Sequence, residues 1–156
     1  MAPDVREGRI GRGLPWLNFG DGPPLAVFSG LGTTNANPAG IQRWGEVRML
    51  SPLARSFTLH RIGRRVGLAP GTTMAGLAQD FAGALEEGFG TPVDVLGIFT
   101  GGSLALQLAA DWPDLVRRLV VAGAACRLSE PGRAFQRRMA DLAAAGAASR
   151  ASRPLT

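Results

Sequence analysis

A short corner centred on Phe99 and flanked by Gly97 and Gly101 is the stretch whose residue types and spacing come nearest to catalytic chemistry. The apolar run at residues 93–98 predicts a buried strand, and the segment that follows predicts a helix. A strand, a sharp turn and a helix in this order raise the middle residue above a parallel sheet, as in the G-x-S-x-G pattern of serine nucleophiles. We expect glycine at 97 and 101 because the two backbones come too close there for a Cβ atom.

The raised position holds Phe99, which has no group that can attack a carbonyl carbon. A bulky residue there occupies a strained backbone region, at a cost of about 1–3 kcal/mol that an enzyme accepts in exchange for reactivity. Ser103 lies one helical turn further on, about 6 Å along the axis, and we interpret it as a packing or backbone-bonded serine. For the sole histidine, His60, a structural role is favoured over a catalytic one.

A second loop contributes to the same predicted edge of the sheet. Gly30-Leu31-Gly32 follows a short apolar run at residues 25–28, which is typical of a strand buried on both faces. In the G-x-S-x-G pattern this loop supplies one backbone N–H of an oxyanion hole, so the N–H groups of Leu31 and Thr100 are expected to point at one spot. The alternative is that the two glycines only turn the chain. Further along this loop, Asn35 and Asn37 either line a pocket or bond to local backbone.

The remaining pattern alternates short strands with helices. A parallel sheet with right-handed crossovers and helices on both faces is therefore predicted, which is an α/β fold. A hairpin or twisted strand is expected at 9–19, buried strands at 25–28, 57–62, 93–98 and 115–122, helices at 41–56, 73–87, 103–111 and 130–148, and a frayed tail at 149–156.

Composition limits the kinds of partner. The net charge is +5, yet all 17 basic residues are arginine and lysine is absent, which we attribute mainly to GC-rich codon usage. The arginine pairs are spread out and not interleaved with aromatic residues, so nucleic-acid binding is not expected. A lone cysteine, Cys126, fits a reducing compartment, and no apolar run has the length of a signal peptide or a membrane span. We expect a cytoplasmic protein of one domain, 1–156, with no cofactor, no metal and no membrane contact.

With these elements in place, the sequence resembles the α/β-hydrolase superfamily. The resemblance covers residues 15 to 145 and rests on the corner at 97–103, on the acidic-proline segment and strand at 110–121, and on the turn at 20–24. It implies a truncated three-layer parallel sheet, with 126–148 as the start of a lid or the following helix. It also implies hydrolysis of an ester, lactone or amide, with the nucleophile position at Phe99 and the oxyanion-hole N–H groups at Leu31 and Thr100.

Three functional hypotheses follow from the resemblance and its missing parts. No histidine follows Phe99, and the acid and histidine of the triad fall on no residue of this sequence. The first hypothesis is a catalytically inactive protein, and the second is a fragment or variant of an active hydrolase. The third is a non-catalytic ligand-binding or interaction module that uses a pocket between Leu31 and Phe99, and an ester-like small molecule is the ligand class that the resemblance implies. Self-association through an exposed sheet edge is expected as well.

Overall fold

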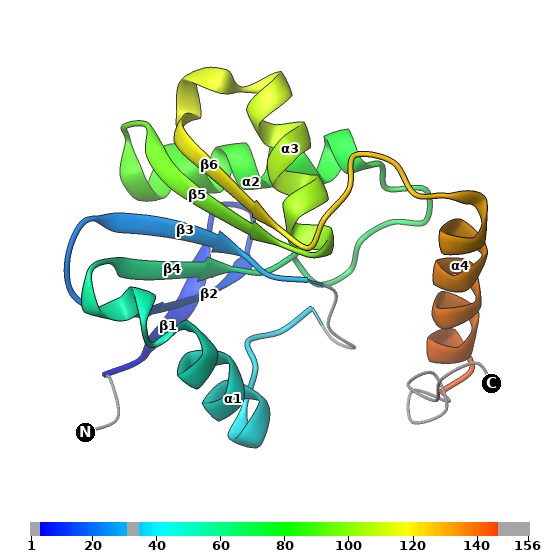
Figure 1. Cartoon of the computed structure of the whole chain (residues 1–156), viewed down its shortest axis with the longest axis horizontal. Coiled ribbons are helices and arrows are strands. Elements are labelled where there is room, and N and C mark those ends of the chain that lie inside the picture. Colours follow the sequence, from blue (N-terminus) through cyan, green and yellow to red (C-terminus); the bar gives the residue numbers. More distant parts are fainter. Residues whose placement is uncertain (1–3, 31–34, 147–156) are drawn as a thin grey trace. The chain divides into compact units, whose positions relative to one another are not determined.

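The computed structural model describes residues 4–30 and 35–146 (Figure 1). It divides into two compact units, Met1–Ala124 and Ala125–Thr156, which are described separately. The first unit contains the sheet and the predicted site. The loop residue Leu31 lies outside the described residues.

The first unit is built on a six-stranded sheet in the order β1-β2-β4-β3-β5-β6. β1 and β2 form an antiparallel hairpin, β2 also pairs antiparallel with β4, and the other four strands are mutually parallel. The predicted hairpin is thus present, although it begins earlier, before residue 9. The strands are β1 (Arg6–Ile10), β2 (Leu14–Phe19), β3 (Pro24–Phe28), β4 (Thr58–Ile62), β5 (Val93–Ile98) and β6 (Val116–Ala122).

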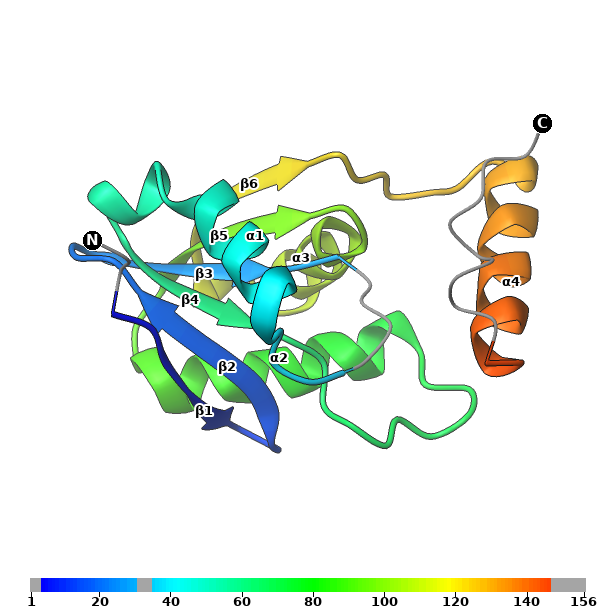
Figure 2. The ribbon, with the colours of Figure 1, turned by 90° about the horizontal axis from the view of Figure 1, so that it is seen from below.

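Helices cover both faces of this sheet, which confirms the three-layer prediction (Figure 2). On one face, α2 (Met74–Phe89) and α3 (Thr100–Asp111) pack on a core that includes Phe28 and Phe81, whose rings meet edge to face. On the other face, α1 (Gly40–Leu50) and a short 3-10 helix, Leu53–Arg55, cover a smaller core. The side chains of the smaller core are those of Phe19, Leu25, Val27, Leu50 and Leu59.

The α2 helix shows how the sequence sets its own ends. The Thr73 side chain accepts a hydrogen bond from the Gly76 N–H, which caps the first turn. Gly90 closes the last turn in the left-handed conformation, with φ of 62°. The two ends of α2 are therefore set by local residue types, and its apolar side chains, among them Phe81 and Leu85, belong to the larger core.

The single helix predicted over 41–56 is wrong in its length. The helix ends at Leu50, and Pro52 separates it from the 3-10 turn because proline cannot donate the next backbone hydrogen bond. Ile41 and Trp44, two apolar residues in the first half of the helix, are exposed. Only the second half of α1, through Val47 and Leu50, packs on the sheet.

The last strand also differs from the prediction. β6 was expected to be buried, but it pairs only with β5 within the described residues and forms an edge of the sheet. Its residues alternate between partly buried and exposed positions, and Val120 is 59% exposed. The apolar run at residues 119–121 indicates a covered strand, whereas here α3 covers one face of it only.

The second unit contains one described helix, α4 (Glu130–Ala144), which falls within the helix predicted over 130–148. Its aromatic residue Phe135 is partly exposed. Across the described part of both units, none of the helices combines the length and the apolar character that crossing a membrane requires.

Candidate functional site

The backbone at Phe99 is strained, as expected for a sharp corner between a strand and a helix. The φ of 52° and ψ of −122° make Phe99 the one residue other than glycine with a positive φ in the described ranges. The strained backbone is held from both sides, because the Phe99 N–H donates to the Ala122 carbonyl at 2.9 Å and the Phe99 carbonyl accepts from the Gly102 N–H at 2.9 Å. The conformation is therefore imposed by β6 and the first turn of α3.

Close backbone contacts explain the glycines around the corner. A Cβ atom built on Gly101 would lie 2.0 Å from the Phe28 carbonyl oxygen, and one on Gly97 would lie 2.5 Å from the Gly102 Cα. Gly102 is equally constrained, since a Cβ there would lie 2.4 Å from the Ala124 Cβ. The sequence motif indicates the first two positions; the third depends on the β6 connection, which the motif does not contain.

The Phe99 side chain projects from the carboxyl edge of the sheet. Its exposed fraction is 63%. A Cβ built on Gly30, after β3, would lie 3.3 Å from the Phe99 Cβ, and one built on Gly123, after β6, would lie 3.0 Å from two ring carbons. The phenyl ring thus lies over two glycines, which present only backbone to it.

Of the two N–H groups predicted to form an oxyanion hole, the structure describes only that of Thr100. Thr100 is the first residue of α3, and N–H groups in the first turn of a helix have no intrahelical partner. The N–H of Thr100 therefore remains a candidate donor for an anionic oxygen. Its expected companion, Leu31, lies outside the described residues.

The structure adds an arginine that the motif analysis did not identify. The Arg64 guanidinium, from the loop after β4, donates a hydrogen bond to the Thr100 Oγ1 at 3.1 Å. Burial and the nearby Arg61 both lower the pKa of Arg64. The signal in the sequence was weak, because an arginine directly after a strand is also typical of a solvated loop.

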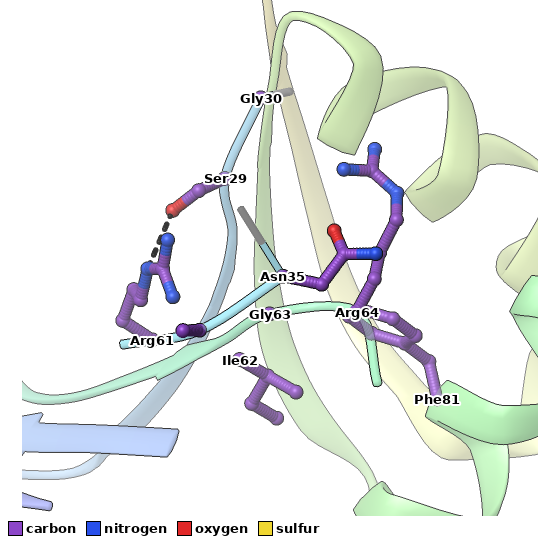
Figure 3. A pocket seen from close by; sticks show the side chains of 9 residues that line it. Ser29, Gly30, Asn35, Arg61, Ile62, Gly63, Arg64 and Phe81 are labelled. Carbon is purple, nitrogen blue, oxygen red and sulfur yellow. Dashed lines mark hydrogen bonds between the residues drawn. The ribbon is translucent and has the colours of Figure 1, made fainter. Parts of the chain in front are cut away.

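A small cavity of about 20 Å³ lies next to Gly30, which forms part of its wall (Figure 3). Arg61 and Arg64 also line this cavity. Arg61 is 12% exposed and donates from its Nε to the Glu46 carboxylate at 2.9 Å and to the Ser29 Oγ at 3.1 Å. Its Nη1 is buried and has no hydrogen-bond partner within the described residues. The Asn35 side chain points towards Arg64.

The two asparagines of this loop have different surroundings, which separates the alternatives left open above. Asn35 lines the cavity. Asn37 instead donates from its Nδ2 to the Trp16 carbonyl at 3.1 Å, so it bonds to the backbone of β2.

His60 lies far from the corner. It pairs with Ala26, which pairs with Val95 in turn, and Val95 precedes Phe99 by four residues or about 13 Å of strand. The Trp16 Nε1–H donates to the His60 Nδ1 at 3.3 Å, and the Phe89 ring packs edge-on against the imidazole. Burial lowers the pKa of His60. These contacts support a structural histidine.

Ser103, the other residue considered as a replacement nucleophile, lies on the first turn of α3. Its backbone N–H donates to the Phe99 carbonyl at 3.3 Å, so it belongs to the hydrogen bonding that holds the corner.

Comparison with known proteins gives the fold a name. No protein-family model matches the chain, and neither does any curated protein. Solved structures do match, among them an α/β hydrolase from Sphaerobacter thermophilus, at 24% identity and a TM-score of 0.63 over 90% of this chain and 55% of that one. A hydrolase from Pseudomonas aeruginosa matches at 24% identity and a TM-score of 0.64, over 89% of this chain and 52% of that one.

A 2-hydroxy-6-oxo-6-phenylhexa-2,4-dienoate hydrolase from Rhodococcus matches at 20% identity and a TM-score of 0.63 over 82% of this chain and 49% of that one. The chain therefore has the α/β-hydrolase fold, as the sequence predicted, and it spans about half the length of these solved proteins.

Proposed function

We propose that the 156-residue chain is a catalytically silent protein with the α/β-hydrolase fold. The observation that supports this most directly is Phe99 at the corner, where the strained backbone of a nucleophile position is present and the hydroxyl is not. The strain has a cost that chemistry normally justifies. Here the corner serves the packing of β5, β6 and α3.

The loss of the nucleophile is by itself sufficient to abolish hydrolytic activity. Removing a serine nucleophile costs on the order of a million-fold in turnover, or about 8 kcal/mol of transition-state stabilisation. Neither candidate substitute repairs this loss, because Ser103 lies on α3, one helical turn beyond the corner residue, and His60 contacts Trp16 and Phe89 away from the corner. We therefore expect no hydrolysis beyond what binding and oxyanion donors give.

The test is activity of the purified chain on p-nitrophenyl acetate and butyrate, with a fluorophosphonate probe as a second readout. We expect no burst of nitrophenol and no serine labelling in the intact-mass spectrum. A burst stoichiometric with protein, or a labelled serine at any position, would overturn the proposal.

A second candidate function is a hydrolase that works in a fuller form. It is favoured by the coverage of the solved hydrolases, of which this chain spans about half. Serine TCC and phenylalanine TTC differ in one base, so resequencing codon 99 and the flanking DNA is decisive. A serine codon at position 99, with a downstream frame that encodes a further strand, an aspartate and a histidine, would support it. A phenylalanine codon without such a frame would exclude it.

A third candidate is a non-catalytic module that binds a small molecule at the same edge. It is favoured by the cavity lined by Arg61 and Arg64, which requires no reactive residue. A rise in melting temperature with a defined ligand would support binding, because a ligand that binds only the folded state stabilises it.

A further inference from the structure

The positive charge around the cavity next to Gly30 exceeds the negative charge that faces it. Arg61 forms a salt bridge with Glu46, whereas no carboxylate in the described ranges forms one with Arg64. Arg64 has one hydrogen bond, to Thr100, among the described residues. Two guanidinium groups and one carboxylate leave one uncompensated charge in a partly desolvated place, where such a charge is costly unless an anion joins it.

The start of α3 adds to the same positive field. The first turn of this helix contains no acidic residue, so the positive end of its dipole is not neutralised from within. The Thr100 hydroxyl accepts from Arg64, which leaves its own hydrogen available to donate outward. An anion beside Arg64 would therefore meet the guanidinium, a hydroxyl and the N-terminal end of a helix together.

A second and independent observation concerns a residue of the cavity wall. The Arg61 Nη1 is buried without a partner, although buried polar atoms are normally hydrogen-bonded. Arg61 lines the cavity together with Arg64 and Asn35 (Figure 3). The volume of about 20 Å³ admits one water-sized group, such as an end of a carboxylate, and not a whole metabolite.

The rest of such a ligand would lie against an apolar surface. Gly30 belongs to the cavity wall, and it is also the residue against which the Phe99 Cβ stands. The Phe99 ring beyond it is largely exposed. We propose that this site binds a small amphiphilic carboxylic acid, with its carboxylate between Arg64 and the first turn of α3 and its apolar part on the Phe99 ring. The proposal specifies the ligand class of the third candidate function, and it rests on that candidate.

The test uses benzoate as the probe, with acetate and inorganic phosphate for comparison, at constant ionic strength. Binding is followed in the full chain by the ¹⁵N–¹H shifts of the Thr100 and Gly101 amides. We expect saturable shifts with benzoate, weaker binding of acetate, and no tighter binding of phosphate than of benzoate. Absence of saturable shifts with benzoate would overturn the site, and phosphate binding tighter than benzoate would overturn the carboxylate assignment.

Two variants locate the charge. Arg64→Gln is expected to weaken benzoate binding by about tenfold or more, because charge-assisted hydrogen bonds are lost. Arg55→Gln is the matched control, since Arg55 is exposed and lies in the 3-10 turn on the other face of the sheet. It should bind within about twofold of the parent, as expected for an exposed charge that makes no ion pair with any described residue. Equal losses in both variants, or no loss in Arg64→Gln, would contradict the proposal.

Folding and the apolar half of the site need their own variants. The melting temperature of each variant without ligand shows that it is folded, and Arg64→Lys provides a gentler change that should retain partial binding. Phe99→Ala is expected to lower benzoate affinity by roughly fivefold, since an aromatic contact is lost, and to leave acetate unchanged. An equal effect on both acids would overturn the role of Phe99. If esterase activity were found, it would contradict the proposed catalytic inactivity, but it would not affect the interpretation of these binding results.

Discussion

The phenyl ring of Phe99 stands over the backbone of Gly123, so closely that a Cβ built on Gly123 would lie 3.0 Å from two of its ring carbons. Gly123 itself has a φ of 63° and directly follows β6. A side chain at position 123 would therefore crowd the ring, which would have to shift to make room. This contact belongs to the folded chain and not to the corner motif alone.

Replacing Phe99 with serine restores the hydroxyl without restoring catalysis. We expect Phe99→Ser to raise the melting temperature slightly, because a smaller side chain relieves crowding at a positive φ and the exposed ring contributes little burial. Turnover of a nitrophenyl ester should stay within about tenfold of the parent, since oxyanion donors without a base give little catalysis.

The double variant Phe99→Ser/His60→Ala is the control for that experiment. If Phe99→Ser gains activity and the double variant loses it, His60 acts as a base and its structural interpretation is wrong. Equal, negligible rates in both variants support the separation between His60 and the corner.

Substitution of the corner glycine tests the close approach of β3 to α3. Gly101→Ala should lower the free energy of unfolding by about 3 kcal/mol or more, because the new methyl group collides with the Phe28 carbonyl and backbone cannot yield easily. Urea denaturation followed by circular dichroism measures this change.

Gly83→Ala is the matched control for Gly101→Ala. Gly83 is exposed on α2, and a Cβ there would meet nothing within 4 Å. Alanine should therefore stabilise the helix by roughly 0.5–1 kcal/mol. Equal losses for the two substitutions would show that the predicted collision is absent.

Much of this fold was predictable because local patterns and tertiary packing agree. The β5 strand, the corner and α3 were found from apolar periodicity and glycine spacing, and α2 from apolar positions spaced by three and four between threonines and a stretch rich in glycine and proline. The incorrect predictions concern residues whose burial depends on tertiary contacts, which a local sequence pattern does not determine. Val120 has the residue type of a buried strand, but whether a second layer covers it depends on tertiary packing.

The candidate site was predictable only in part for a similar reason. The spacing around Phe99 predicts the corner, whereas the hydrogen bond from Arg64 to Thr100 joins a loop to the start of a helix 36 positions away. No periodicity or motif indicates such a contact, because a side-chain hydrogen bond between distant segments follows from the fold. The unpartnered Arg61 Nη1 is likewise visible only after packing.

The lowered pKa of His60 predicts a loss of stability in mild acid. Burial disfavours its imidazolium form, so between the folded pKa and the ordinary value of 6.5 the unfolded chain binds more protons. The stabilising contribution is complete above pH 6.5 and is lost as the pH falls towards the folded pKa. Melting temperatures between pH 8 and pH 5 measure this loss.

The control for the pH profile is His60→Gln, whose side-chain oxygen can still accept from Trp16. Since His60 is the only histidine, this variant should show a flatter profile over the same range. An unchanged slope would mean that another group causes the pH dependence.

The edge at β6 predicts self-association. Val120 is 59% exposed and lies opposite the half-buried Leu96 of β5, so an apolar strip adjoins an unpaired strand edge. We expect elution volumes in size-exclusion chromatography to shift towards larger species as the concentration rises. Val120→Lys should reduce that shift by placing a charge on the strip.

Val66→Lys is the matched control for Val120→Lys, because Val66 has the same 59% exposure but lies in the loop after β4. It should leave the concentration dependence unchanged. A parent chain that elutes as a monomer at every concentration would contradict the expected association, as would equal effects of the two lysine variants.

The hydrogen bonds that hold Phe99 involve only its own main-chain atoms, with Ala122 on one side and Gly102 on the other. Whatever side chain occupies this position is therefore presented in the same direction, at an exposed point, by a backbone that does not depend on it. For protein engineering, position 99 is therefore an attachment point whose backbone geometry is fixed. A cysteine, a labelled residue or an unnatural amino acid could be displayed there with its orientation set in advance by the surrounding strands.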